Sequence, residues 1–161
     1  MTKSLLQVKE LTTELGGKPQ PLRVVDGLDL HLQAGETLAL LGESGCGKSM
    51  TALSLMRLLP PSGRILAGSV RLGGTDLLRL TETEMREVRG GRLAMIFQEP
   101  QTSLNPVLTV GAQIAEAVRV HAGCSRAQVP ERVVDLLRAV GIPDPAQRAG
   151  EYPHQLSGGM K

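Results

Sequence analysis

Residues 42–49 read Gly42-Glu43-Ser44-Gly45-Cys46-Gly47-Lys48-Ser49, and this stretch decides the fold of the 161-residue chain. It matches the pattern G-x-x-x-x-G-K-[ST], whose glycines let consecutive backbone N–H groups turn inward around phosphates. Lys48 offers a compact charge to the β- and γ-phosphates, and the Ser49 hydroxyl suits Mg²⁺. Before the loop, residues 37–41 are an apolar run typical of a buried strand; after it, residues 50–59 favour a helix. Strand, loop and helix in this order predict a nucleotide site.

Charge and composition narrow the class of partner. Lys plus Arg number 18 against 16 Asp plus Glu, so no strong basic field points to nucleic acid. Phe97 and Tyr152 are the only Phe, Tyr or Trp residues, which removes the usual stacking surface for single strands. Cys46 and Cys124 form no metal-ligand spacing, and both suit a reduced compartment. No apolar stretch approaches ~18 residues, so we expect a cytosolic chain unless a partner carries it to a membrane.

Three segments predict an antiparallel β layer beside the nucleotide-binding strand. Residues 4–11 have the composition of a strand. Residues 28–32 alternate leucine with polar side chains, as expected of a half-buried strand. Residues 68–75 read as a further strand followed by a tight turn.

The next elements end at a candidate catalytic residue. Thr81 and Glu84 have capping-box spacing, which predicts a short helix that runs to about Arg89. Residues 92–97 then read as a second buried strand, and Gln98 stands at its end. Ligands of open α/β sheets bind at the carboxyl ends of strands, so Gln98 is placed to reach a metal or an attacking water. Without other evidence, a glutamine at a strand end is most often a loop residue that faces solvent.

The character of the chain changes at residue 100. Strand signals stop, and two amphipathic helices are expected at residues 110–121 and 126–140, with Pro130 bending the second. We therefore predict an α/β fold in two parts: a nucleotide-binding core over residues 1–99 and a helical subdomain over residues 100–161. The expected N-caps and stops of the two helices are Thr109, Gly123, Ser125 and Gly141.

The segment Leu156-Ser157-Gly158-Gly159 follows the phosphate loop by about 110 residues, with Gln98 between them. This combination resembles the ATP-binding subunits of ABC transporters, which have a P-loop NTPase core. Residues 98–110 and 151–161 resemble, more narrowly, the oligopeptide/dipeptide importer branch, which includes nickel importers. The resemblance extends from Leu5 to Lys161.

The resemblance implies a site shared between two subunits. ATP and Mg²⁺ would be bound by residues 42–49, with Ser49 and Gln98 at the metal and Gln98 positioning the water. Ser157, Gly158 and Gly159 would touch the ATP held by a second ABC ATPase subunit, in a homodimer or a heterodimer. Residues 98–110 would dock the transmembrane permease subunits, at the cytoplasmic face of the cell membrane. A turn at Asn105-Pro106 and the apolar side chains of Leu104, Val107 and Leu108 are compatible with such a contact, and filling the core of the helical subdomain explains these side chains equally well.

The sequence departs from the family pattern at two places. Residues 1–96 contain no aromatic residue to stack on adenine, so base contact would come from aliphatic or arginine side chains near Leu15 or Arg23. The family's hydrolytic Asp-Glu pair follows the signature, so the general base is absent from residues 1–161. Glu99 adjoins Gln98, but the family pattern gives it no such role.

These departures lead to an expectation about residues 1–161 as an isolated polypeptide. The strand that carries the Asp-Glu pair normally lies beside the phosphate-loop strand, so residues 37–41 and 92–97 would lack a neighbour. We expect this polypeptide to fold poorly and to hydrolyse ATP negligibly. Two other functions remain open: a soluble or exporter-type ABC ATPase, and a non-catalytic nucleotide-binding fragment.

Overall fold

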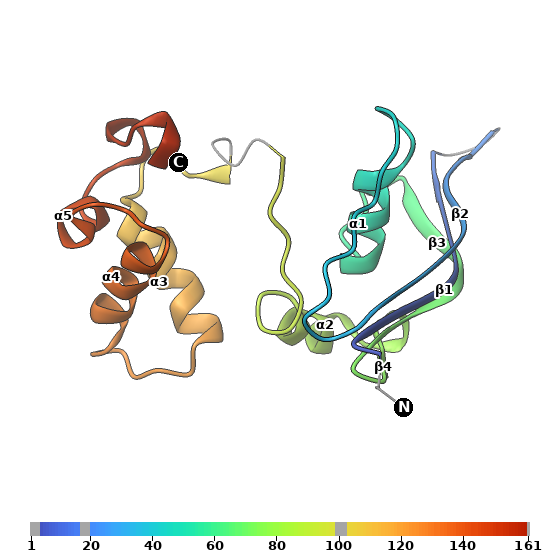
Figure 1. The fold of residues 1–161 in the computed structure, drawn as a ribbon, viewed down its shortest axis with the longest axis horizontal. Helices are drawn as coiled ribbons and strands as arrows, with labels where there is room; N and C mark the ends of the chain where they lie inside the picture. The colour runs from blue at the N-terminus through green and yellow to red at the C-terminus, as the bar shows by residue number, and fades with distance from the viewer. Residues whose placement is uncertain (1–3, 17–19, 99–102, 161) are drawn as a thin grey trace. The chain divides into compact units, whose positions relative to one another are not determined.

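The computed structural model describes residues 4–16, 20–98 and 103–160, and the chain divides into two compact units, Met1–Arg86 and Glu87–Lys161. Figure 1 shows the ribbon of both units. The division falls after Arg86, whereas the predicted boundary lies after residue 99. Each unit has its own elements and is described separately.

The first unit contains an antiparallel sheet, as the sequence predicted. Its strands are β1 (Leu6–Leu15), β2 (Leu22–Leu32), β3 (Gly63–Leu72) and β4 (Thr75–Asp76), in the order β2-β1-β3-β4. Strand β1 is one of the two interior strands, and its Val8 pairs with Leu30 on one side and with Val70 on the other. Val8 and Val70 are buried because alternate side chains of these strands face the core.

Helix α1 (Lys48–Met56) packs on this sheet (Figure 1). The hydroxyls of Thr13 in β1 and Ser54 in α1 are hydrogen-bonded at 2.9 Å, and both residues are fully buried. The helix ends at Arg57, which adopts a left-handed backbone with φ of 52°. A guanidinium nitrogen of Arg57 then donates to the carbonyls of Leu77 and Leu80. The helix therefore stops earlier than the predicted Leu59.

Helix α2 (Glu82–Val88) begins with the predicted capping box. The Thr81 amide donates to a carboxylate oxygen of Glu84 at 2.8 Å, and the Glu84 amide donates to the Thr81 hydroxyl at 3.3 Å. These reciprocal bonds satisfy amides that the first helical turn leaves without backbone partners. Met85, inside the helix, is fully buried.

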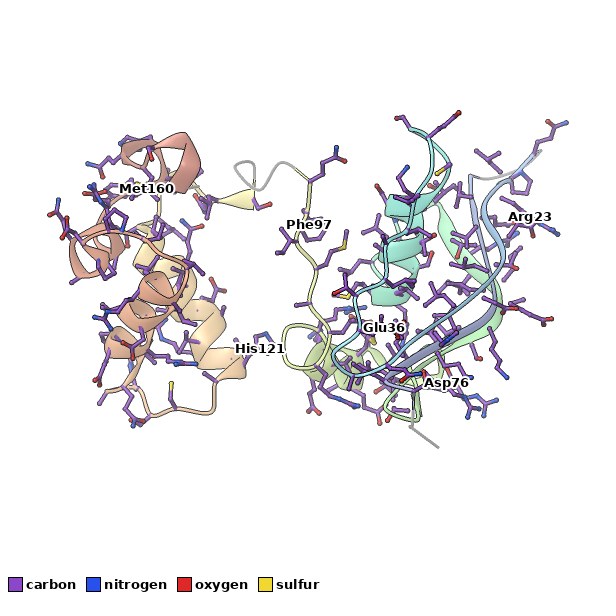
Figure 2. All side chains as sticks on the ribbon, viewed as in Figure 1. Arg23, Glu36, Asp76, Phe97, His121 and Met160 are labelled. Carbon is purple, nitrogen blue, oxygen red and sulfur yellow. The ribbon has the colours of Figure 1, made fainter. Side chains whose placement is uncertain are left out.

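The prediction of buried strands at residues 37–41 and 92–97 is wrong. Both segments are irregular apart from one isolated bridge between Arg89 and Leu93. Leu41 is 88% exposed and Ile96 is 90% exposed, and Phe97 also projects from its segment (Figure 2). A buried strand needs neighbours that pair with its backbone. Within the described ranges, the single four-stranded sheet includes neither segment.

The second unit is a small bundle of helices. Its elements are α3 (Val110–His121), α4 (Val129–Ala139) and α5 (Pro145–Ala149), followed by 3₁₀ turns at Pro153–Gln155 and Gly158–Met160. Apolar side chains from α3, from α4 and from the end of the first 3₁₀ turn form its core: Val110, Ala115, Val118, Val129, Val133, Leu137 and Leu156. No helix within the described part of the chain is long and apolar enough to cross a membrane.

Most predicted helix ends in this unit are confirmed. The Thr109 hydroxyl accepts from the Ala112 amide at 3.3 Å and caps α3. Gly123 and Gly141 have φ of +60° and +78°, the left-handed conformation that suits glycine after a helix.

The predicted start of α4 is wrong by one turn. Residues 126–128 form a turn, closed where the Ser125 amide and hydroxyl both donate to the side-chain oxygen of Gln128. The helix begins only at Val129, so Pro130 lies in its first turn. Because first-turn amides have no intrahelical acceptor, this proline removes no helical hydrogen bond, and the predicted bend has no cause.

Candidate phosphate-binding site

The phosphate loop connects an irregular segment to the start of α1, and its glycines are required by the local geometry. Gly45 and Gly47 have φ of +84° and +94°, a conformation that L side chains rarely adopt. A Cβ at Gly47 would lie 2.3 Å from the Val24 carbonyl oxygen of β2, so both the conformation and the space exclude a side chain. The Cys46 amide donates to the Glu43 carbonyl at 3.3 Å and closes the turn.

Gly42, at the other end of the motif, is constrained by a side chain rather than by the backbone. A Cβ there would meet the Cys46 sulfur at 2.5 Å, and the Lys48 ammonium nitrogen lies 3.9 Å from the same point. The loop therefore curls back on itself around the space that a Gly42 side chain would fill. Between the ends of the motif, Glu43 and Ser44 are exposed.

Lys48 holds the loop in this shape. Its ammonium nitrogen donates to the carbonyls of Gly42 and Glu43, both at 2.6 Å, and lies 3.4 Å from the Cys46 sulfur. An ammonium group has three donors and no acceptor. The side chain that the sequence assigned to the β- and γ-phosphates therefore lies inside the loop, bound to its carbonyls. Phosphate oxygens entering the loop would compete for these donors.

The start of α1 completes the cradle. Gly47 is its N-cap and provides no side-chain hydrogen bond, and the first turn contains no acidic residue. The leading amides and the helix dipole are therefore available to an anion. Ser49 lies in this turn and is exposed, so its hydroxyl can reach a ligand there. A cradle that a Cβ would fill, a cation and an uncapped helix N-terminus fit ATP with Mg²⁺.

The metal assignment depends on the nucleotide as well as on the protein. Among the described residues there is no cluster of three or more His, Cys, Asp or Glu side chains that could hold a metal ion. The sequence predicted a different donor set: the Ser49 hydroxyl and the Gln98 amide, acting with phosphate oxygens. Gln98 is an exposed bend residue of the second unit, and its meeting with Ser49 stays a prediction.

The signature segment, Leu156–Gly159, belongs to the second unit. Leu156 is 7% exposed and anchors the segment in the helical core. Ser157, Gly158 and Gly159 are exposed, and the Met160 amide donates to the Ser157 carbonyl at 3.0 Å in a single 3₁₀ turn. A Cβ at either glycine would meet nothing within 4 Å, and neither has a left-handed backbone. Nothing in the described surroundings of these two positions requires glycine.

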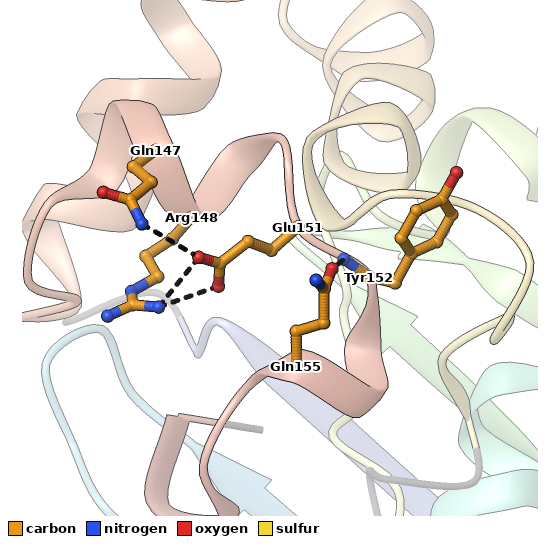
Figure 3. A network of polar contacts seen from close by, with 5 residues as sticks. All are labelled: Gln147, Arg148, Glu151, Tyr152 and Gln155. Carbon is orange, nitrogen blue, oxygen red and sulfur yellow. Dashed lines mark hydrogen bonds and ion pairs between the residues drawn. The ribbon is translucent and has the colours of Figure 1, made fainter.

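Sequence reasoning missed a polar network that precedes the signature segment (Figure 3). One guanidinium nitrogen of Arg148 donates to both carboxylate oxygens of Glu151, at 2.8 and 2.9 Å, and Gln147 donates to one of them at 3.2 Å. The hydrogen bond from Arg148 holds the pKa of Glu151 below its usual value, and Glu151 raises the pKa of Arg148. The i,i+3 spacing of Arg148 and Glu151 was the signal that could have found it.

The expected docking segment, residues 98–110, is described in part, since residues 99–102 lie outside the described residues. The predicted turn at Asn105 is present: its side-chain oxygen accepts from the Val107 amide at 3.1 Å. Val107 is 75% exposed and Leu108 is 41% exposed, whereas Leu104 is half-buried. Two of the three apolar side chains expected at a docking surface therefore face solvent.

Comparison with known proteins adds three findings. A family model described as ABC transporter matches residues 25–161. The chain is 51% identical over 158 residues to a protein of Sinorhizobium fredii named "Probable peptide ABC transporter ATP-binding protein", with 98% of this chain and 47% of that protein covered. It is 47% identical over 157 residues to the dipeptide transport ATP-binding protein DppD of Escherichia coli, with 98% of this chain and 48% of that protein covered.

The chain is also 48% identical over 159 residues to the oligopeptide transport ATP-binding protein AppD of Bacillus subtilis, with 98% of this chain and 48% of that protein covered. The chain thus spans about half the length of these curated relatives. Two solved dimeric structures of the bacterial ABC transporter cassette MJ0796, the second in a post-hydrolysis state bound to ADP and Pi, share its fold. Each superposes with a TM-score of 0.79 at 22% identity, covering 96% of this chain and 64% of the other.

Proposed function

Because the chain belongs to the ABC transporter family, we propose that it is part of the ATP-binding subunit of an importer for dipeptides, oligopeptides or related solutes. The observation that carries this proposal is the complete phosphate cradle of residues 42–49 in a chain that also has the signature segment. Names of relatives at 47–51% identity support peptides as the solute class. Within this proposal, residues 1–99 bind the nucleotide and residues 100–161 form the helical subdomain.

The phosphate cradle would bind ATP by charge and by backbone geometry. The Lys48 ammonium, now held by two carbonyls, would turn to the β- and γ-phosphates while the amides at the start of α1 face the same anion. The Ser49 hydroxyl would ligate Mg²⁺ together with Gln98, and the metal would neutralise charge between the phosphates.

The base of the nucleotide would lie beside β2. The Val24 carbonyl lies against Gly47, so this part of β2 adjoins the phosphate loop. Its neighbour Arg23 is exposed and paired with Asp26 at 3.2 Å, and a guanidinium plane can stack on a base. Leu15 pairs with Leu22 at the same end of the sheet. Arg23 and Leu15 therefore remain our candidates for adenine contact.

The signature segment would act on a second subunit. Gly158 and Gly159 have no close neighbour and no left-handed backbone, so a surface outside the described chain is a sufficient reason for their small size. With Ser157 they would offer a hydroxyl and two unhindered amides to the γ-phosphate bound by the partner ATPase. The dimeric MJ0796 cassette has the same fold, which supports pairing.

Hydrolysis and transport would need parts beyond these residues. The resemblance assigns the general base to a position after the signature, so residues 1–161 would provide the cradle and Gln98 but not the base. Val107 and Leu108, exposed in the docking segment, would contact permease subunits at the cytoplasmic face of the membrane. Transport proteins among the relatives support this location.

Nucleotide binding to the subunit that contains this chain tests the proposal. Lys48→Ala removes the cation of the cradle, and we expect ATP affinity to fall at least about tenfold, the equivalent of losing ~1.4 kcal/mol of charge-assisted contact. Lys9→Ala is the matched control, because Lys9 is an exposed lysine of β1 away from the cradle. Equal ATP affinity in wild type and Lys48→Ala would contradict the proposal.

A further inference from the structure

The loop before the signature segment is fastened to the start of α3. The Val110 amide, the first of α3, donates to the Glu151 main-chain carbonyl at 2.9 Å. First-turn amides have no acceptor inside their own helix, so Glu151 provides an acceptor that α3 lacks. Gly111 packs against the same region so closely that a Cβ there would lie 2.6 Å from the Ala149 carbonyl oxygen. The end of α5 and the start of α3 therefore form one close backbone contact.

Residues 105–108 of the docking segment are held to the same helix end. The Gln113 side chain accepts from the Asn105 amide at 2.9 Å and donates to the carbonyls of Asn105 and Leu108 at 3.0 and 3.1 Å. Residues 105–108 are thus bound to the first turns of α3. A displacement of this turn would move the Val110 amide with it.

Short-range bonds connect Glu151 to the signature segment. The Tyr152 amide donates to the Gln155 side chain at 2.8 Å, and the Gln155 amide returns to the Tyr152 carbonyl at 2.9 Å. Pro153, which is buried, restricts the backbone between them, and the buried Leu156 follows. Few free rotations remain between Glu151 and Ser157.

The carboxylate of Glu151 fixes its own main chain through the pair with Arg148. The side chains of Arg148 and Glu151 are only 27% and 16% exposed, so the pair is better shielded from water than the Asp135–Arg138 pair of α4, at 46% and 64%. The Arg148 Nε is buried and has no hydrogen-bond partner among the described residues. Glu151 is the main partner of the guanidinium, and Asp144 adds a smaller electrostatic contribution.

We propose that Arg148 and Glu151 are positioning residues, which hold the Glu151 carbonyl on the start of α3 and so set the position of Ser157–Gly159 relative to the docking segment. This inference rests on the proposed function, because the signature segment must act on the partner's ATP for its position to matter. The Arg148–Glu151 pair would then connect the docking segment to the signature segment within the second unit.

Hydrogen exchange tests the positioning without reference to catalysis. In the complete subunit, Glu151→Ala and Arg148→Met should each raise exchange at the Val110 amide and at the hydrogen-bonded amides of Gln155, Leu156 and Met160. Asp135→Asn is the matched control, because Asp135 forms an i,i+3 ion pair with Arg138 in α4 of the same unit. The double variant Arg148→Glu with Glu151→Arg should restore protection. Unchanged exchange in the single variants would overturn the proposal.

Steady-state ATPase activity of the assembled transporter provides the second readout. Glu151→Ala should lower kcat by about tenfold or more, since a misplacement of ~1 Å can cost up to a hundredfold. The ATP affinity of the isolated subunit should stay within about twofold of wild type, because the cradle lies in the other unit. Raised exchange with unchanged kcat would overturn the positioning role. Failure of the proposed function would give a different result. In that case the assembled transporters with wild-type and Lys48→Ala subunits would have the same ATPase activity.

Discussion

At the residue scale, two kinds of glycine occur in the candidate site. Gly47 must be glycine because its backbone is left-handed and a Cβ would clash with the Val24 carbonyl, whereas a Cβ at Gly42 would require the Cys46 side chain to move. Gly158 and Gly159 have room within the second unit, and a surface that approaches them is a sufficient reason for their small size. The first pair shapes a cradle within this chain, and the second pair suits a contact between chains.

The Glu151–Arg148 pair makes a prediction about pH. The pKa of Glu151 is lowered chiefly by the hydrogen bond from Arg148, with a smaller contribution from Gln147, while burial opposes them. A carboxyl whose pKa is lower in the folded state stabilises the fold above its unfolded pKa of about 4.3, and this is lost as pH falls through the lowered value. Protection of the Val110 amide should therefore fall below about pH 4.

Glu151→Gln is the test of that pH dependence, because it keeps the shape of the side chain and removes its titration. Protection of Val110 in this variant should be lower near pH 7 and should change less between pH 5 and 3. Glu84 is a useful internal comparison, since its pKa is also lowered, by Thr81, and α2 should keep its own acid sensitivity. A Val110 profile with the same acid slope in both proteins would rule out Glu151 as the titrating group.

At the element scale, two local capping signals predicted helix starts correctly and a third did not. The capping box of Thr81 with Glu84 and the cap of α3 by Thr109 depend on spacing alone, and both are present. The start of α4 was misread because Ser125 bonds to the Gln128 side chain, which stabilises a separate turn before the helix. Two polar residues at capping distance fit either structure, so sequence spacing alone does not distinguish them.

The α3 cap gives a quantitative expectation. Thr109→Ala removes the acceptor for the Ala112 amide and should cost about 1 kcal/mol of local helix stability, equivalent to roughly fivefold faster exchange in the first turns of α3. Thr83→Ala is the matched control, an exposed threonine inside α2, where alanine should change exchange little. Equal effects of the two substitutions would show that Thr109 contributes nothing as a cap.

At the scale of the whole molecule, the two halves of the proposed catalytic machinery belong to different compact units. The phosphate cradle lies in Met1–Arg86 and the signature segment in Glu87–Lys161. The apolar side chains expected in central strands, such as Leu41 and Ile96, are exposed. Our expectation that residues 1–161 alone fold poorly and turn over little ATP stays a prediction, and this exposure is its physical basis.

Because the phosphate cradle and the signature segment lie in different units, we expect that one substitution can lower ATP turnover without lowering ATP affinity. Ser157→Arg places a bulky cation on an exposed turn and should leave ATP affinity of the isolated subunit within about twofold, because its cradle is untouched. Turnover by the assembled transporter should fall at least about tenfold, since the partner's ATP would meet the arginine. Lys48→Ala, by contrast, should lower both the ATP affinity of the isolated subunit and turnover by the assembled transporter.

Ser125→Arg is the control for that experiment, because Ser125 is an exposed serine of the same unit outside the signature segment. It should change neither ATP affinity nor turnover by more than about twofold. If Ser157→Arg weakened ATP binding to the isolated subunit as strongly as Lys48→Ala, the signature segment would belong to the same site as the cradle. The proposal of an intersubunit site would then be wrong.

Sequence alone determined the phosphate loop, the antiparallel layer, the helices of the second unit and the family resemblance. Each depends on motifs or periodicities that are complete within a short stretch of chain. Tertiary structure decided that residues 37–41 and 92–97 are not strands, because strand formation depends on a neighbour that composition does not reveal. It also decided that the Glu151 carbonyl meets the Val110 amide, a contact between residues far apart in sequence. Only the folded chain brings such groups together.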